Sequence, residues 1–132
     1  MFLIDLNKAP QSAYAIFATQ QAHGDEEVLR AQGIIESEFA RALTLDELAR
    51  QVTMSRRNFV RCFKRATGNA PREYLGRVRV EAAKRALERT PRPIAAIAAD
   101  VGYEDVVAFR QLFARSTGLT PSEYRARHRA VL

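Results

Sequence analysis

The stretch FKRATGNAPREY at residues 63–74 returns fifty positions later as FARSTGLTPSEY at residues 113–124. Seven of the twelve positions are identical, namely Phe, Arg, Thr, Gly, Pro, Glu and Tyr. The glycine suits the left-handed position that follows a helix, and the proline three residues later suits the first turn of a new helix. Each copy therefore predicts the end of one helix and the start of the next.

Two helices joined by a tight turn are predicted between residues 44 and 68, and the second of them ends within the first copy of the phrase. Thr44 and Glu47 have the spacing of a capping box, which starts a helix that ends near Val52. Ser55 can cap a second helix, which runs to Gly68. A helix of about eight residues, a tight turn and a helix of about twelve form the helix-turn-helix layout.

The same layout is predicted a second time, in PIAAIAADVGY followed by DVVAFRQLFARSTG at residues 93–118. The apolar positions of the first helix recur at a shift of 49 residues, and those of the second helix recur at a shift of 50. The difference indicates one inserted residue around 102–104. The internal repeat therefore predicts two successive helix-turn-helix units.

A long helix is predicted between the units, from Pro71 to about Glu88, with two apolar faces that suit packing between two bodies. One face holds Tyr74, Leu75, Val78 and Ala82, and the other holds Val80, Ala83 and Leu87. The fold class expected is all-α with about seven helices. The first unit covers about 41–69, the linker helix about 70–88 and the second unit about 92–128, within a tandem helix-turn-helix domain at 25–132.

Residues 1–24 show no sustained period and are predicted to be an extended leader. Helical periodicity begins at Asp25, a candidate N-cap. Val28, Ala31, Ile35 and Phe39 then fall on one face of a helix.

Composition argues against several classes of protein. The single cysteine, Cys62, excludes an intrachain disulfide and a zinc cluster, and it lies on an apolar stripe. His23 and His128 stand alone, and Ser55 has no nearby histidine in the sequence and suits a helix cap. No apolar run approaches the roughly 18–20 residues that span a bilayer. We therefore expect no enzyme, no metal, no cofactor and no membrane segment, in a cytoplasmic protein.

The charge is distributed unevenly along the chain. Residues 1–40 carry two bases and six acids, a net charge of −4, whereas residues 41–132 carry 19 bases and nine acids, a net charge of +10. A basic domain of this kind is typical of proteins that bind polyanions. The alternative is an ordinary solvated surface that is basic.

The second helix of each unit has the pattern of a recognition helix, at about 55–66 and 105–116. The first has five bases and no acid, with Phe59, Cys62, Phe63 and Ala66 on the buried stripe and Arg57, Val60, Arg61 and Lys64 facing out. The second presents Val107, Arg110, Gln111 and Ala114. Arginine can pair with guanine, glutamine with adenine, and valine or alanine with the thymine methyl group. The alternatives are a solvated charged face and a second copy kept for stability.

The linker helix predicts the spacing of the two recognition helices. About 18 residues span roughly 27 Å, which with the end turns approximates the 34 Å of one turn of B-DNA. The two helices could then enter successive major grooves. Because the repeat runs twice in the same direction, the double-stranded target is expected to be asymmetric.

The stretches LTLDELARQVTMSRRNFVRCFKRATGNAPREYLGRVRVEAAKRAL and PIAAIAADVGYEDVVAFRQLFARSTGLTPSEYR resemble the DNA-binding domain of AraC/XylS-type bacterial transcription regulators, over about residues 43–125. The resemblance implies sequence-specific double-stranded DNA binding, transcription regulation and contact with RNA polymerase. It implies base readout by Arg57, Val60, Arg61, Val107, Arg110 and Gln111, and phosphate or flanking contacts by Ser55, Arg56, Lys64 and Arg65. One departure is Thr53 in the first turn, where family members often have glycine.

The leader FLIDLNKAPQSAYAIFATQQAHGD at residues 2–25 is similar to the end of the amidotransferase-like (PfpI-like) domain that precedes this module in one subgroup. This similarity implies a C-terminal fragment, monomeric by itself, of a nucleoid-associated regulator whose effector acts through a missing N-terminal domain. The alternative function is a basic helical module that binds RNA or a protein partner.

Overall fold

The computed structural model describes the backbone of residues 11–129 and the side chains of residues 24–129. Within this range the chain forms seven α-helices and no strand, which confirms the predicted all-α class. The helices are α1 (Gln11–Glu38), α2 (Leu45–Gln51), α3 (Arg56–Thr67), α4 (Pro71–Arg89), α5 (Ile94–Asp100), α6 (Val106–Thr117) and α7 (Pro121–His128). None of these helices is both long and apolar enough to cross a membrane.

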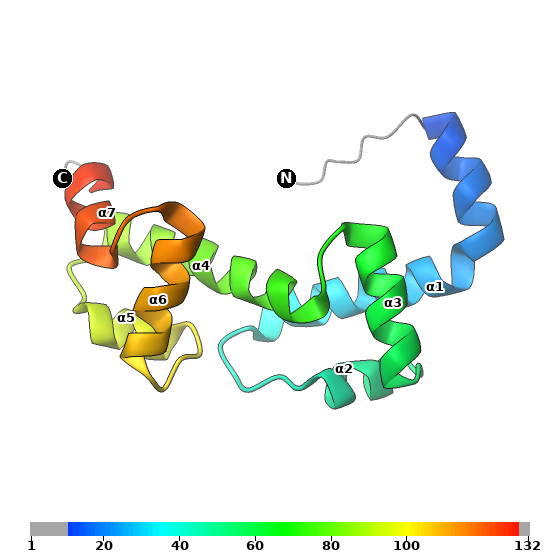
Figure 1. Ribbon diagram of the computed structural model, residues 1–132, viewed down its shortest axis with the longest axis horizontal. Coiled ribbons are helices and arrows are strands. Elements are labelled where there is room, and N and C mark those ends of the chain that lie inside the picture. Colours follow the sequence, from blue (N-terminus) through cyan, green and yellow to red (C-terminus); the bar gives the residue numbers. More distant parts are fainter. Residues whose placement is uncertain (1–10, 130–132) are drawn as a thin grey trace.

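The two helix-turn-helix units, α2–α3 and α5–α6, lie at opposite ends of α4 (Figure 1). Each unit has its own apolar core, and α4 contributes to both. The first core takes Tyr74, Leu75 and Val78 from α4, and the second takes Val80, Ala82, Ala83, Ala86 and Leu87. The predicted grouping of Ala82 with Tyr74 was wrong, because α4 passes from one core to the other along its length.

The duplicated phrase builds the same helix exit in both units. The Thr67 hydroxyl donates to the Phe63 carbonyl at 2.8 Å and accepts from the Asn69 backbone N–H at 3.1 Å. Gly68 follows in the left-handed region, at φ 81°. In the second unit the same interactions join Thr117 to the Phe113 carbonyl and the Leu119 N–H, with Gly118 at φ 79°. The repeated residues therefore act mainly as helix caps and core.

The final tyrosine of each copy ties its helix to an earlier one. The Tyr74 hydroxyl donates to the Glu36 carboxylate of α1 at 2.5 Å, and the Tyr124 hydroxyl donates to the Glu88 carboxylate of α4 at 2.5 Å. Burial, reinforced by these hydrogen bonds, raises the pKa of both tyrosines to about 12. Helix α1 therefore makes the same contact with the helix after the first unit as α4 makes with the helix after the second unit. The structural repeat thus includes the helix before each unit.

The turns of the two units have the same hydrogen bonds despite their different sequences. In the first, the Thr53 and Met54 N–H groups donate to the Arg50 and Ala49 carbonyls at 3.1 and 2.9 Å. Gly102 and Tyr103 repeat this pattern with Ala99 and Ala98, at the same two distances. Thr53 has a φ of 58°, so it takes the left-handed conformation in place of the glycine expected from the family pattern. Since Asp105 caps α6 as Ser55 caps α3, the inserted residue of the second turn is Glu104.

Replacing Thr53 with glycine is expected to raise the free energy of unfolding by about 0.5–1 kcal/mol. Glycine removes a steric cost of roughly 1–2 kcal/mol and adds about 0.5–1 kcal/mol of conformational entropy to the unfolded chain. Urea unfolding of the two proteins measures the difference. Thr53→Ala is the control, since it removes the hydroxyl that donates to the Val52 carbonyl at 2.6 Å but keeps the Cβ. An equal gain in both variants would contradict the backbone explanation.

The N-terminal helix is longer than predicted. Residues 11–24 are helical and continuous with the following residues, so the expectation of an extended leader was wrong there, and Asp25 lies inside α1 instead of capping it. The stretch from residue 11 to 22 is rich in alanine and glutamine, which favour helix. Residues 1–10 of the leader lie outside the described part of the chain. Val28, Ala31 and Ile35 are buried as predicted, whereas Phe39 lies beyond the helix, half-buried against the second core.

Candidate nucleic-acid interface

The first recognition helix is held by a polar cap and a buried aromatic stripe. The Ser55 hydroxyl accepts from the Asn58 N–H at 3.2 Å, which starts α3. Phe59 and Phe63 are completely buried, in edge-to-face contact at 5.6 Å between ring centroids, and Cys62 is buried beside them. These residues fix the rotation of α3 on the core. Ala66, predicted to be buried, is exposed because the core ends before the last turn of α3.

The opposite face of α3 is open and basic. Arg57, Arg61 and Lys64 are exposed at successive turns of the helix, and Val60 is half-buried between them. The Asn58 side-chain oxygen accepts a hydrogen bond from the Arg61 guanidinium. This neighbour was not predicted, although its spacing of three residues on a helix could have suggested it. Three cations on one face, with no acidic residue in α3, can bind guanine edges or phosphates.

The predicted flanking residues lie at the two ends of α3. Arg56 reaches the Asp46 carboxylate at 3.7 Å, but both side chains are about two-thirds exposed, so a phosphate could displace this weak pair. The Ser55 hydroxyl accepts in the cap and donates to no other described residue, so its proton can be donated to an anion. Arg65 is exposed at the end of α3, and its Nη2 lies 3.7 Å from the Cys62 sulfur of the same helix and close to Gly24 of α1.

The second recognition helix presents a different surface on the same frame. Asp105 caps α6 by accepting from the Val107 N–H at 2.9 Å, and Phe109 and Phe113 are completely buried. Val107 is 57% exposed and, with Leu29, is one of two exposed large apolar side chains among the residues with described side chains. Arg110 and Gln111 are also exposed. This face therefore combines apolar contact with one charge and one amide, and it is less basic than the face of α3.

The six predicted base-reading residues fall on the two recognition helices, three on each, and five of them are exposed. Figure 1 shows α3 and α6 running in similar directions near opposite ends of α4. At a rise of about 1.5 Å per residue, the 19 residues of α4 span roughly 28 Å. The arrangement presents two separate exposed faces joined by one helix.

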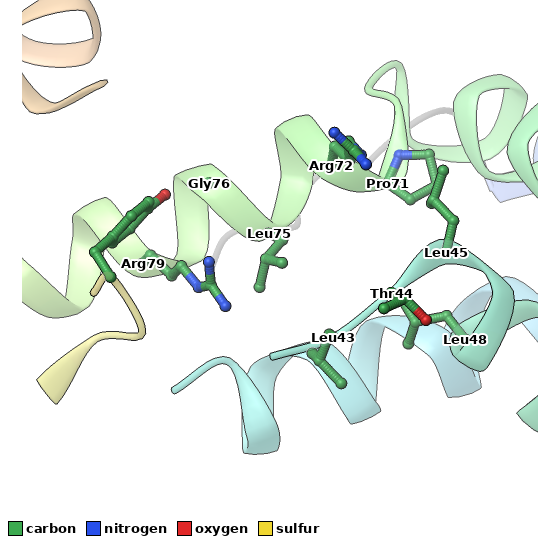
Figure 2. A pocket seen from close by; sticks show the side chains of 10 residues that line it. Leu43, Thr44, Leu45, Leu48, Pro71, Arg72, Leu75, Gly76 and Arg79 are labelled. Atoms are coloured by element: carbon green, nitrogen blue, oxygen red, sulfur yellow. The ribbon is translucent and has the colours of Figure 1, made fainter. Parts of the chain in front are cut away.

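A cleft of about 340 Å³ lies along α4 between the start of α2 and the turn of the second unit (Figure 2). It is lined by Leu43, Thr44, Leu45, Leu48, Pro71, Arg72, Leu75, Gly76, Arg79 and Tyr103. The side chains of α2 and of the segment before it stand opposite those of α4 (Figure 2). No cluster of metal-binding side chains occurs among the described residues.

Comparison with known proteins identifies the same architecture. Residues 48–127 match the family described as Helix-turn-helix domain. The chain is 42% identical over 81 residues to the HTH-type transcriptional regulator Rv1931c of Mycobacterium tuberculosis, which covers 61% of this chain and 31% of that protein. The chain spans about a third of the length of the curated relatives it matches.

Two solved structures resemble the fold closely. One is a transcriptional regulator of Chromobacterium violaceum described as containing an AraC-type DNA-binding domain, with a TM-score of 0.74, 27% identity and coverage of 81% of this chain and 96% of that one. The other is the DNA-binding domain of AdpA in complex with a target DNA, with a TM-score of 0.73, 32% identity and coverage of 76% and 90%. Since the family match takes in most of both units and the whole of α4, this chain belongs to the AraC-type helix-turn-helix DNA-binding domains.

Proposed function

We propose that this chain binds double-stranded DNA sequence-specifically, as the DNA-binding domain of a bacterial transcription regulator. The observation that carries the proposal is the pair of exposed faces on α3 and α6, held at the two ends of α4. In this proposal α3 and α6 enter successive major grooves. Arg57, Val60, Arg61, Val107, Arg110 and Gln111 contact bases, and Ser55, Arg56, Lys64 and Arg65 contact phosphates or flanking groups.

The two units have different tasks in this proposal. Helix α3 supplies most of the electrostatic affinity, because it carries five cations, three of them on its open face, and no acid. The face of α6 adds base discrimination through Gln111 and the exposed Val107. Because the two faces differ and follow one another in the same direction, the target is an asymmetric site.

The family resemblance also implies an effector-binding domain and a protein partner for the whole regulator. An N-terminal domain, of amidotransferase-like (PfpI-like) type by the resemblance of the leader, would bind the effector. RNA polymerase would be the second partner, and the place of action would be the cytoplasm, at the bacterial nucleoid. The named relatives are transcription regulators, which supports a binding function rather than an enzymatic one.

Salt-dependent binding to three nucleic acids of equal length tests the proposal. Duplex DNA is expected to bind more tightly than single-stranded DNA or RNA. With about six phosphate contacts, the affinity for duplex should fall on the order of 10³-fold between 50 and 200 mM salt. Fluorescence anisotropy gives the three dissociation constants, and selection from a random duplex pool gives the binding site. Equal affinity for all three would favour a basic RNA- or protein-binding module instead.

A further inference from the structure

The relative placement of α3 and α6 depends on few elements. Each helix pair that packs extensively involves α4, or joins two of α1, α2 and α3, or joins α6 to α5 or α7. The cleft between α2 and the turn of the second unit leaves part of the boundary between the units unfilled (Figure 2). A single helix with a cleft beside it can bend or twist, so any further contact between the units influences how the two reading faces are aligned.

Arg79, near the middle of α4, makes such a contact. Its Nε donates to the Phe39 carbonyl at 2.8 Å, and its Nη2 donates to the Arg41 carbonyl at 3.0 Å. Both acceptors lie just after α1, which packs against α2 and α3 of the first unit. The centre of the same guanidinium lies 5.0 Å from the centroid of the Tyr103 ring, in the turn of the second unit. One side chain thus joins three segments through hydrogen bonds and a cation–π contact.

Gly102 allows the three segments to come this close. A Cβ at this position would lie 2.9 Å from the Arg79 guanidinium carbon and 2.9 Å from the Phe39 carbonyl oxygen. The φ of Gly102 is also 106°, which strongly favours glycine. Phe39 itself packs against the second core although it follows a helix of the first unit. The turn of the second unit therefore packs directly against the Arg79 guanidinium and the backbone just after α1.

We propose that Arg79 is a positioning residue that sets the distance and angle between α3 and α6, and thereby the half-site spacing that the domain accepts. The inference rests on the proposed DNA-binding function. Adding one base pair between half-sites separates them by about 3.4 Å and rotates them by about 35°. With Arg79 in place, the two units are held in one arrangement and resist this change. Without the guanidinium, the units can shift relative to one another and adapt to it more easily.

Binding to duplexes of altered spacing tests this role. The selected duplex is compared with versions that are one base pair longer or shorter between the half-sites, for the wild type and for Arg79→Met. Methionine keeps much of the side-chain length but has no donors. For each protein, the dissociation constant for the altered spacing is divided by that for the native spacing. This ratio is expected to be at least about fivefold lower in Arg79→Met than in the wild type, because the variant loses less preorganisation when it adapts. Arg79→Lys should fall between the two proteins.

The control is Arg77→Met, which removes the same charge from an exposed position two residues earlier, on roughly the opposite side of α4. It should leave the spacing ratio unchanged, even where it weakens all duplexes together. A merely structural role of Arg79 would lower the active fraction and scale every dissociation constant equally. An unchanged ratio in Arg79→Met would therefore overturn the inference.

A measurement without DNA separates this inference from the proposed function. Spin labels at Gln51→Cys in α2 and Ala99→Cys in α5, in a Cys62→Ala background, report the distance between the units. The distance distribution should broaden in Arg79→Met and stay narrow in Arg77→Met. An unchanged distribution would overturn the role of Arg79. Absence of sequence-specific binding by the wild type would instead remove the proposed function, and the spin labels would still decide whether Arg79 holds the units.

Discussion

Replacing both Arg57 and Arg61 with alanine is expected to lower the affinity for the selected duplex on the order of 10²- to 10³-fold. Each side chain can make a bidentate contact that contributes about 1–3 kcal/mol. Both residues are exposed on α3, so the variant should fold normally. Dissociation constants from anisotropy, with the helical content checked by circular dichroism, measure the effect. The slope of affinity against salt shows how much of the loss comes from phosphate contacts.

The matched control is Arg85→Ala with Arg89→Ala, two exposed arginines at the same four-residue spacing on α4. This variant has the same net charge as the first and should lose far less affinity, since neither residue lies on a reading face. Gln111→Ala should also lose less than either single change at Arg57 or Arg61, because a neutral amide contributes little electrostatic affinity. Dissociation constants in the opposite order would contradict the assignment of affinity to the first unit.

Replacing Gly102 with alanine is expected to lower the free energy of unfolding by about 3 kcal/mol or more. An L residue in the left-handed region costs roughly 1–2 kcal/mol, and the clash of its Cβ adds to this cost. One of the clashing atoms is the backbone oxygen of Phe39, which cannot rotate away as a side chain can. Relief would require moving the end of α1 or releasing the hydrogen bonds of Arg79. Urea unfolding followed by circular dichroism measures the loss.

Gly118→Ala is the control for this prediction. Gly118 is also left-handed, at φ 79°, but a Cβ there would meet no atom within 4 Å. Its substitution should therefore cost only the conformational term of about 1–2 kcal/mol. Equal losses at the two glycines would show that the close approach of the second turn to α1 and Arg79 does not add to the cost of the substitution in the free energy of unfolding.

Much of the local structure follows from short stretches of the sequence. A glycine after a helix, a proline in the first turn and a capping Ser, Thr or Asp act within about four residues, so their effects do not depend on the rest of the fold. The rotation of α3 and α6 was also predictable, since Phe59, Phe63, Phe109 and Phe113 recur at helical spacing and are all buried. The predicted reading residues therefore lie on the outer faces of both helices, where their roles remain predictions.

Other predictions failed where distant segments decide the outcome. Ala82 shares a helical face with Tyr74 but packs in the second core, because its position along α4 matters more than its rotation. Threonine disfavours the left-handed region, yet Thr53 adopts it. The first turn makes the same two backbone hydrogen bonds as the glycine-containing second turn, and these hold Thr53 in that conformation. The helix through residues 11–24 was missed because its apolar residues have no clear period, although its composition favours helix.

The sequence by itself determined a duplicated helix-turn-helix frame, its caps and the faces that point outwards, because these depend on periodicity and on interactions between near neighbours. Only the tertiary structure decided how the two units are held. Arg79 binds carbonyls about forty residues earlier in the chain and stacks on a ring 24 residues later. Backbone carbonyls carry no sequence signature, so no pattern could reveal this contact. The side chains that would read DNA are local features of the sequence, whereas the geometry that aligns them comes from the fold.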